Sequence, residues 1–218
     1  MQSEVVDCAS APWLRSEHAG ANHLQMATLV LVWALFVGAG LVELNRYAAT
    51  PGRDEAPPAQ WPADSAIVRD DRPTLVVLIH PMCPCSRASL SELNRLLLRV
   101  NSGGVLRVNA HVLFIAPEGT VESWQNSELC AKARSIAGVT VDVDADRREA
   151  RLFGASTSGS CLLYGSDGVL LFHGGVTGAR GHEGENEGRR LLQAHLLEQD
   201  SRPSACRVYG CPLFEEER

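Results

Sequence analysis

The sequence has little positive charge and few aromatic residues. Its 218 residues carry 20 Lys and Arg against 26 Asp and Glu, a net charge of −6, and 6% are Phe, Trp or Tyr. Proteins that bind nucleic acid through its phosphates present a basic surface, so this balance argues against nucleic acid as a main partner. Because 45% of the residues are hydrophobic, the chain can form a packed core, which excludes disorder over its full length.

Cysteine is too sparse, and odd in number, for a small scaffold held together by disulfides. There are 7 cysteines in 218 residues, whereas such scaffolds are short and rich in cysteine. A structural zinc site usually needs two closely spaced cysteine pairs, and no second knuckle is evident beside Cys83-Pro84-Cys85. The other close pair, Cys206 and Cys211, lies near the C-terminus.

Residues 26–43 are predicted to form one transmembrane helix that follows an N-terminal tail, 1–25. Met26–Val42 reads MATLVLVWALFVGAGLV and carries no charge, which is the short end of the roughly 20 residues that span a bilayer. A cleaved signal peptide would begin with a short basic segment, and a buried core helix would show a polar stripe. These two readings are the alternatives to a single-pass anchor that binds the chain to a membrane.

Arginines on the two sides of this apolar run hardly decide its orientation. Arg15 stands before the run, and Arg46 and Arg53 stand after it, which leans slightly toward a cytoplasmic C-terminal domain. The thiol chemistry described below favours the periplasm, where disulfide exchange is useful. We therefore expect a membrane protein whose soluble domain is periplasmic.

The rest of the chain divides into a linker, a domain and a tail. Residues 44–66 contain Pro51, Pro57, Pro58 and Pro62, and such a stretch is predicted to be extended and structureless. The folded domain is expected over 67–200. The C-terminal tail, 201–218, carries a cysteine pair and is expected to be irregular.

Within the domain, apolar runs alternate with helical patterns. Short β-branched runs predict strands, and apolar residues at a spacing of three and four predict helices. The expected order is β-α-β-α-β-α-β-β-α, and it begins with a buried strand at Thr74–Ile79, TLVVLI. A βαβ start followed by a ββα end is the thioredoxin arrangement. The predicted fold class is α/β, a thioredoxin-like three-layer α/β/α sandwich with a mixed central sheet. The expected strands are 74–79, 108–115, 139–143, 161–164 and 169–172, and the expected helices follow Ser86 and cover 123–137, 147–153 and 185–199.

The chemistry is concentrated where the first strand turns into the first helix, at HPMCPCS. Sites form at the carboxyl ends of strands in α/β sheets, and the partial positive charge of a helix N-terminus stabilises a thiolate. We therefore predict a dithiol redox pair whose partners are protein thiols and disulfides. Cys83 is the preferred nucleophile and Cys85 the preferred resolving residue, although the two roles could be reversed. A Cys-Pro-Cys disulfide is geometrically tight, which predicts a stronger oxidant or isomerase than thioredoxin.

Three other interpretations stay open at this point. His80, Cys83 and Cys85 are soft ligands that suit copper(I) or zinc, so the alternative to a cofactor-free protein is a copper-handling module, with His182 or Cys211 as a further ligand. The domain could instead be a non-catalytic binding module. The two cysteines could also be buried structural thiols, although the strand-to-helix position argues against burial.

Three strings carry a resemblance to a known family: HPMCPCSRASLSEL, RLFGASTSGSCLLYGSDGVLLFHGGVTGARGHEGENEG and YGCPLF. Together they resemble the RedB-type proteins, a bacterial group with a thioredoxin-like fold, over roughly Thr74–Phe214. The resemblance implies the fold and a thiol site but no particular substrate. The sequence departs from thioredoxins at Thr157-Ser158-Gly159-Ser160, where that family has a cis-proline facing its site, so a thioredoxin-type substrate groove is in doubt.

A few further residues are candidates for lining the site. Pro84 lies in the cysteine turn, and Gly159 lies in the loop that is expected to face it. The glycine-rich loop Val176–Gly188 contributes Arg180 and also His182, which is a candidate base or ligand. Cys211 could cap the thiol site or pair with Cys206. Three aspartates, Asp142, Asp144 and Asp146, lack the glycine of a calcium loop and are expected to be exposed.

Overall fold

The structure, a computed structural model, describes residues 19–53, 55–116, 124–198 and 202–214. The chain divides into two compact units, Met1–Asn45 and Arg46–Arg218. Within helix α1 (Ala19–Ala49), the span Asn22–Ala49 contains an 18-residue window with a mean hydropathy of 2.1, and none of that window is buried. The span is long and apolar enough to cross a membrane. Cys8 lies outside the described residues.

The second unit is built on one mixed sheet with the strand order β3-β2-β1-β4-β5-β6. Strand β1 (Thr74–Ile79) pairs in parallel with β2 (Asn109–Ala116), which pairs in parallel with β3 (Val139–Ala145). On its other side β1 pairs antiparallel with β4 (Ser160–Tyr164), which forms a hairpin with β5 (Leu170–Gly174). The predicted order of strands and helices is confirmed, and this sheet is that of the thioredoxin-like fold.

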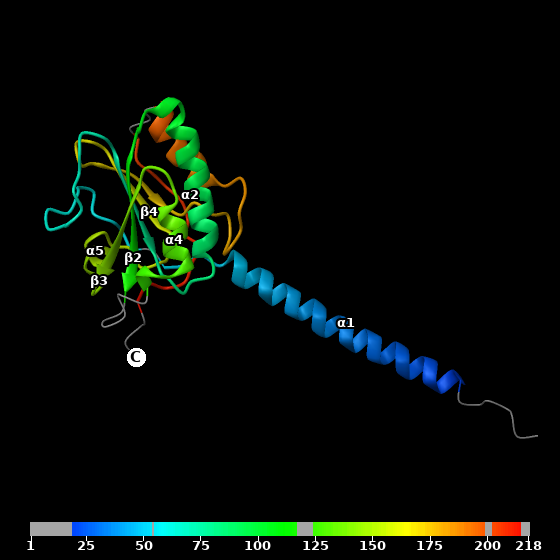
Figure 1. The fold of residues 1–218 in the computed structure, drawn as a ribbon. Helices are drawn as coiled ribbons and strands as arrows, with labels where there is room; N and C mark the ends of the chain where they lie inside the picture. Colours follow the sequence, from blue (N-terminus) through cyan, green and yellow to red (C-terminus); the bar gives the residue numbers. More distant parts are fainter. Residues whose placement is uncertain (1–18, 54, 117–123, 199–201, 215–218) are drawn as a thin grey trace, which may run out of the picture. The chain divides into compact units, whose positions relative to one another are not determined.

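Helices and the linker cover the two faces of the sheet and give three layers. On one face, helices α2 (Ser86–Val100), α4 (Glu128–Arg134) and α6 (Glu187–Gln193) pack on the larger apolar cluster. On the other face lie α5 (Arg148–Leu152) and parts of the linker and tail, around a smaller cluster that includes Trp61 and Leu213. Figure 1 shows α2 beside the orange C-terminal helix, with α5 on the opposite side of the sheet. The α/β/α fold class is therefore confirmed.

Two predicted helices are shorter than expected. The helix predicted at 123–137 begins after Ser127, whose hydroxyl accepts a hydrogen bond from the Cys130 backbone N–H, as an N-cap does. Residues 117–123 lie outside the described residues. The last helix begins after its own N-cap, Asn186, and continues from Gln193 into a π-helical turn, Ala194–Glu198. Sequence periodicity locates both helices but places the end of the first three residues too late and the start of the last two residues too early; the predicted boundaries at 123 and 199 lie outside the described residues.

Helix α1 is longer than the predicted 26–43: it begins at Ala19, inside the predicted tail, and its C-terminal end takes in residues 44–49 of the predicted linker. The rest of the linker has little regular secondary structure but is not structureless. Its backbone is held on the domain by hydrogen bonds from Thr157 to Arg53 (2.6 Å), from Tyr164 to Pro58 (2.9 Å) and from Leu170 to Ala59 (2.9 Å). Proline removes backbone donors but leaves the carbonyl groups as acceptors. The domain donates hydrogen bonds to carbonyl groups of the linker, so the proline-rich segment is attached to the domain surface.

The prediction that all three aspartates are exposed is wrong for Asp144. Its side chain is buried and accepts hydrogen bonds of 2.9 Å from the backbone N–H groups of Glu149 and Ala150. It thereby satisfies two of the unpaired donors in the first turn of α5. Asp142 and Asp146 are exposed, as predicted.

The tail is also more ordered than predicted. Ser204–Ala205 form the two-residue strand β6, which extends the sheet beside β5. The chain then turns back across the end of the sheet that carries the cysteine turn, as the hydrogen bonds described below show.

Candidate functional site

The Cys-Pro-Cys turn has a defined hydrogen-bonded backbone. The N–H of Cys83 donates to the carbonyl of His80 (3.1 Å), and the carbonyl of Cys83 accepts from Ser86 (3.0 Å). Cys85 is the N-cap of α2 and already has helical backbone angles, φ −70° and ψ −22°. The two cysteines therefore stand at the N-terminus of α2, as predicted.

The turn is braced by two serine hydroxyls that sequence analysis did not single out. Ser158 accepts a hydrogen bond from the His80 N–H (2.8 Å), and its hydroxyl lies 3.1 Å from that of Ser86. Ser86 also donates to the His80 carbonyl (3.0 Å). The available sequence signal was the presence of serines in the strings CPCS and TSGS. Buried hydroxyl groups in proteins are hydrogen-bonded, so a serine beside a buried turn is a candidate to brace it.

Both cysteines are buried, which the strand-to-helix position had argued against. Cys83 is 4% exposed and Cys85 is 8% exposed. Their cover comes from the C-terminal tail and from the loop after β5, whose positions a local pattern does not predict.

The tail covers the turn by pairing with the loop before β4. Ser158 donates its N–H to the Cys211 carbonyl (2.8 Å), and Leu213 donates to the Ser156 carbonyl (2.8 Å), on either side of an antiparallel bridge between Thr157 and Pro212. The side chain of Leu213 is buried in the smaller apolar cluster. This two-stranded contact fixes the register of the tail and brings Cys211 to the thiol site.

Of the two positions considered for Cys211, it lies at the thiol site beside Cys83 and forms no disulfide with Cys206. Burial alone would raise the pKa of the Cys83 thiol, but hydrogen bonds from the thiol and the backbone N–H of Cys211 outweigh it. The backbone N–H of Cys85 and the hydroxyl of Ser86 add to them, and the pKa of Cys83 falls below its ordinary value. Donors aimed at the sulfur stabilise the thiolate in the way that general rules for cysteine reactivity require.

The two neighbouring thiols shift in the opposite direction. Burial first, and then the charge of Cys83, raise the pKa of Cys85. Burial, with the hydrogen bond to Cys83, raises the pKa of Cys211 to about 12. The site therefore holds one thiolate-prone sulfur, Cys83, between two thiols that keep their protons.

Arg180 ties the predicted loop to this site. Its charge favours the thiolate forms of both Cys85 and Cys211, and the next residue, Gly181, donates a backbone hydrogen bond to Cys85. Its guanidinium also donates to the Gly210 carbonyl and to the Thr50 carbonyl (3.2 Å). Arg180 is thus a clamp between the linker and the tail.

The other predicted lining residues have different surroundings. Pro84 is exposed above the turn. Gly159 has φ +92°, and a Cβ there would lie 2.9 Å from the Ser89 hydroxyl, so the position requires glycine. His182 is exposed, and its ring lies beside Gly178 and Gly184. His80 uses Nδ1 to accept a hydrogen bond from the Met82 N–H (3.2 Å).

Within the described residues, no group of three His, Cys, Asp or Glu side chains is placed to hold a metal ion. The assignment of His80, Cys83 and Cys85 as copper(I) ligands stays a prediction.

The remaining cysteines lie elsewhere. Cys161 is fully buried on β4, its thiol donates to the Gly159 carbonyl (3.4 Å), and burial raises its pKa far above the ordinary value. Cys206 donates to the Gly175 carbonyl (3.3 Å). Cys130 is buried on α4. Of the two roles considered for Cys161, a buried strand residue or a neighbour of Cys83, the structure supports the buried strand residue.

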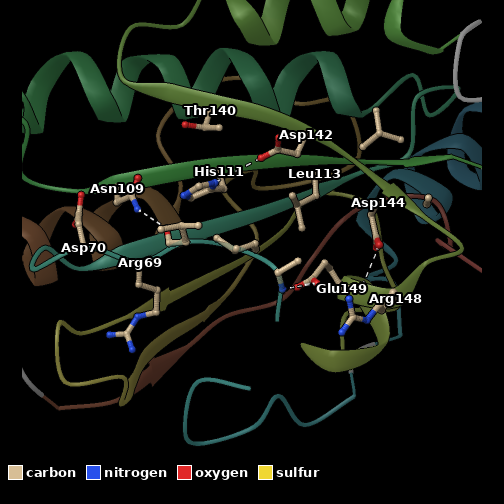
Figure 2. A pocket seen from close by; sticks show the side chains of 15 residues that line it. Arg69, Asp70, Asn109, His111, Leu113, Thr140, Asp142, Asp144, Arg148 and Glu149 are labelled. Atoms are coloured by element: carbon tan, nitrogen blue, oxygen red, sulfur yellow. Dashed lines mark hydrogen bonds and ion pairs between the residues drawn. The ribbon is translucent and has the colours of Figure 1, made fainter. Parts of the chain in front are cut away.

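A separate cleft of about 770 Å³ lies on the sheet face that carries α5, lined by residues of the segment before β1 and by β2, β3 and α5. Figure 2 shows His111 at its floor, facing Asp142 across the dashed line, with Arg69 and Asn109 to one side and Glu149 and Arg148 to the other. The His111 ring is 7% exposed, its Nδ1 lies 3.7 Å from an Asp142 carboxylate oxygen, and neither ring nitrogen has a hydrogen-bond partner. No cysteine lines this cleft.

Comparison with known proteins identifies relatives in fold only. No protein-family model matches the sequence, and no curated protein matches it significantly. Among solved structures, an uncharacterized conserved protein from Geobacillus kaustophilus is 16% identical with a TM-score of 0.53, over 78% of this chain and 94% of its own. A hypothetical protein from Sinorhizobium meliloti is 20% identical with a TM-score of 0.50, over 75% and 93%. Likeness at these identities shows the fold and leaves the reaction to the site itself.

Proposed function

We propose that the protein is a membrane-anchored thiol–disulfide oxidoreductase in which Cys83 is the nucleophile. One observation carries the proposal: the Cys83 sulfur, at the N-terminus of α2, receives hydrogen bonds from Cys211, Cys85 and Ser86, and its pKa lies below the ordinary value although it is buried. A thiolate is the species that attacks a disulfide. A structural thiol in an apolar core, such as Cys161, has the opposite shift.

The reaction has two exchanges. The Cys83 thiolate attacks a disulfide of the substrate, forms a mixed disulfide and releases one substrate thiolate. A second thiol of this chain then gives up its proton and attacks the Cys83 sulfur, which releases the second substrate thiolate and leaves an intramolecular disulfide. The substrate disulfide is reduced by two electrons, and the protein dithiol is oxidised by two.

The resemblance to RedB-type proteins is part of this proposal, since the strings HPMCPCS, RGHEGENEG and GCPLF include the turn, the Arg180 loop and the tail that meet at Cys83. Helix α1 would anchor the chain. We place the thiol domain on the periplasmic side, where disulfide exchange is useful. Protease treatment of cells with and without a permeabilised outer membrane tests this, because a periplasmic domain is digested only after permeabilisation and a cytoplasmic one is not.

The decisive experiment is an intact-mass measurement on the full chain in detergent, purified without reductant. We expect a mass two hydrogens lower than that of the reduced chain, reversed by dithiothreitol, and exchange with a disulfide-linked fluorescent peptide. Cys83→Ser should lose this exchange, because a serine hydroxyl without a base is a poor nucleophile. Cys130→Ser, which removes a buried thiol on α4, is the matched control and should exchange like the wild type.

Two other results would refute the proposal. A stoichiometric metal in native mass spectra, with the thiols protected from alkylation, would identify a metal-handling module. Metal-free thiols that neither exchange nor react would identify a binding domain that has the fold without the chemistry.

A further inference from the structure

We propose that the redox couple of this site is Cys83 with Cys211, and that Cys211 is the sulfur at which external thiols exchange. The inference rests on the proposed function and replaces the partner that the Cys-Pro-Cys spacing favours. It makes the C-terminal tail, remote from the turn in sequence, a part of the reacting centre.

The first support is the position of Cys211, which backbone pairing places on the same Ser158 that braces the cysteine turn at His80. Hydrogen bonding by its thiol and backbone N–H also lowers the pKa of Cys83. The residue is held there by backbone pairing on both sides, at Ser158 and at Leu213, and by the guanidinium of Arg180 on the Gly210 carbonyl. A disulfide needs two sulfurs that are already adjacent on backbones able to hold a narrow geometry, and the paired tail provides this.

The second support is the poor geometry of the alternative. Cys85 is two residues from Cys83 and already belongs to the first turn of α2, where its carbonyl accepts from Ala88 (3.1 Å) and Ser89 (3.2 Å). The thiols of Cys83 and Cys85 also hydrogen-bond to each other, so contact alone does not choose between the two partners. A Cys83–Cys85 bond, however, closes a small ring that contains Pro84, whose backbone angle is fixed, while disulfide geometry is narrow. A Cys83–Cys211 bond joins two separate segments and closes no such ring.

The third support is access. Cys83 and Cys85 are buried, but Cys211 is only partly buried. In the oxidised protein, an incoming thiolate would therefore meet the Cys211 sulfur first. The Cys83 thiolate is then the leaving group, and a thiol of low pKa leaves faster. The backbone N–H of Cys85 and the hydroxyl of Ser86 receive the charge on Cys83.

The proposed exchange balances with an external dithiol as the reductant. One of its thiolates attacks the Cys211 sulfur, the Cys83–Cys211 bond breaks, and Cys83 departs as the thiolate. The second external thiol loses its proton and attacks the sulfur bound to Cys211, which releases Cys211 as a thiolate that takes up a proton. The dithiol ends as a disulfide, and Cys83 and Cys211 end as thiols. Oxidation of the pair by a substrate disulfide begins instead at the Cys83 thiolate, as in the proposed function, and Cys211 then loses its proton and attacks the Cys83 sulfur to restore the Cys83–Cys211 bond.

The test maps disulfides in the full chain in detergent. The reduced protein is oxidised in a glutathione buffer, quenched with acid, alkylated, digested with trypsin and analysed without reduction. Trypsin separates Cys206 from Cys211 at Arg207, and fragmentation at Pro84 distinguishes Cys83 from Cys85. We expect the Cys83–Cys211 link in the wild type and, undiminished, in Cys85→Ser.

Two variants remove the link by different means. Cys211→Ser removes the sulfur but retains a donor. Gly210→Ala retains every thiol, but its Cβ would overlap the Ser158 carbonyl oxygen and displace the tail. Both should lose the crosslink, while Cys206→Ser, the same change in the same tail away from Cys83, should keep it.

A second readout tests the access argument. When the oxidised chain is treated briefly with glutathione, a monothiol, the adduct should appear on the Cys211 peptide and Cys83 should become free. An adduct on Cys83 would overturn the assignment of the exchanging sulfur.

The outcomes separate this inference from the proposed function. A Cys83–Cys85 or Cys206–Cys211 link in the wild type, with Cys83 still reactive, would overturn the inference and leave the oxidoreductase standing. A Cys83 that forms neither a disulfide nor a glutathione adduct would overturn both.

Discussion

Cys83 and His111 are both titratable, both buried, and lie toward opposite ends of neighbouring strands. The surroundings of Cys83 favour its charged form, whereas those of His111 favour its neutral form. Cys83 follows β1 and is 4% exposed, and His111 lies near the start of β2 and is 7% exposed. Four hydrogen-bond donors face the Cys83 sulfur, so its pKa is lowered in favour of the charged form. The pKa of His111 is lowered mainly by burial, in favour of the neutral form. Burial opposes charge at both places, and only local donors reverse it.

The thiol region also contains a buried carboxylate held by ion pairs, whereas the buried carboxylates of the His111 cleft, Asp144 and Glu149, are held by hydrogen bonds from backbone N–H groups and from Ser65. Glu92 on α2 is 0% exposed and accepts a hydrogen bond from the Gly184 N–H (2.9 Å) while it forms ion pairs with Arg95 and with Arg189 (3.0 Å). These contacts join the helix that begins at Cys85 to the loop that carries Arg180. The helix and the loop beside the thiol site are thus joined through the buried Glu92 carboxylate, whose charge is balanced by two arginines.

The largest expected effect comes from removing that charge. Glu92→Gln leaves the mostly buried guanidinium of Arg189 without its buried partner, and we expect a loss of about 3–5 kcal/mol of unfolding free energy. Chemical denaturation followed by near-ultraviolet circular dichroism measures it. Glu128→Gln is the matched control: this carboxylate is exposed and paired with Arg87 (3.0 Å), so its loss should cost less than about 1 kcal/mol. Equal losses in both variants would show that the network is not a special support.

A smaller effect isolates the donors to Cys83. Cys211→Ala removes the thiol donor and keeps the backbone N–H, so the pKa of Cys83 should rise toward its ordinary value. Cys211→Ser keeps a donor and should shift the pKa of Cys83 less. The pH dependence of alkylation at Cys83 reports both. An unchanged profile in Cys211→Ala would mean that the tail covers the sulfur without stabilising its charge.

The corresponding change in the cleft acts on stability, with a pH dependence of definite sign. Because the pKa of His111 is lowered on folding, the unfolded chain binds more protons below about pH 6.5, and stability falls as the pH drops through that value toward the folded pKa. His111→Leu removes two buried nitrogens without hydrogen-bond partners, so we expect a neutral effect or a gain of about 1 kcal/mol near neutral pH.

The pH profile distinguishes this explanation from simple repacking. Denaturation at pH 5 and at pH 7.5 should show a smaller acid loss in His111→Leu than in the wild type. His182→Leu removes an exposed imidazole and serves as the control, with the wild-type acid loss retained. If His111→Leu is as acid-sensitive as the wild type, another group causes the acid loss.

Much of the fold could be predicted because its signals are local. The run TLVVLI defines β1, and helical spacing defines α2, so the element order and the position of Cys83 follow from short segments. The candidate cluster could be predicted only in part. Arg180 and Cys211 were recognised as chemically capable, but the arrival of Cys211 at Cys83 depends on backbone pairing between Ser158 and Cys211, and that of Arg180 at the tail on its contact with Gly210. Hydrogen bonds between distant segments leave no periodicity in the sequence.

The cleft could not be predicted for a related reason. His111 lies inside an apolar strand pattern and reads as a core residue. Which residues flank it, from the segment before β1, from β3 and from α5, is a property of the packed chain. The same is true of Asp144, whose aspartate spacing indicated exposure until α5 placed two backbone donors against it.

The smallest effect tests how the two regions differ at the level of one ion pair. Asp142 lies 3.7 Å from His111 and partly opposes the effect of burial, with Asp70 contributing in the same direction. Asp142→Asn should therefore lower the pKa of His111 further, and because Asp142 is exposed the effect on stability should stay below about 1 kcal/mol. Stability at pH 7.5 should not change, because His111 is neutral there in both proteins, and the loss below pH 6.5 should grow slightly. Titration of the His111 Cε1–H resonance by nuclear magnetic resonance measures the shift directly. Asp71→Asn, at an exposed residue that is not among the groups affecting His111, is the control. A midpoint that stays fixed in Asp142→Asn would show that burial alone sets the charge state of His111, and the contrast with the donor-stabilised Cys83 would then be complete.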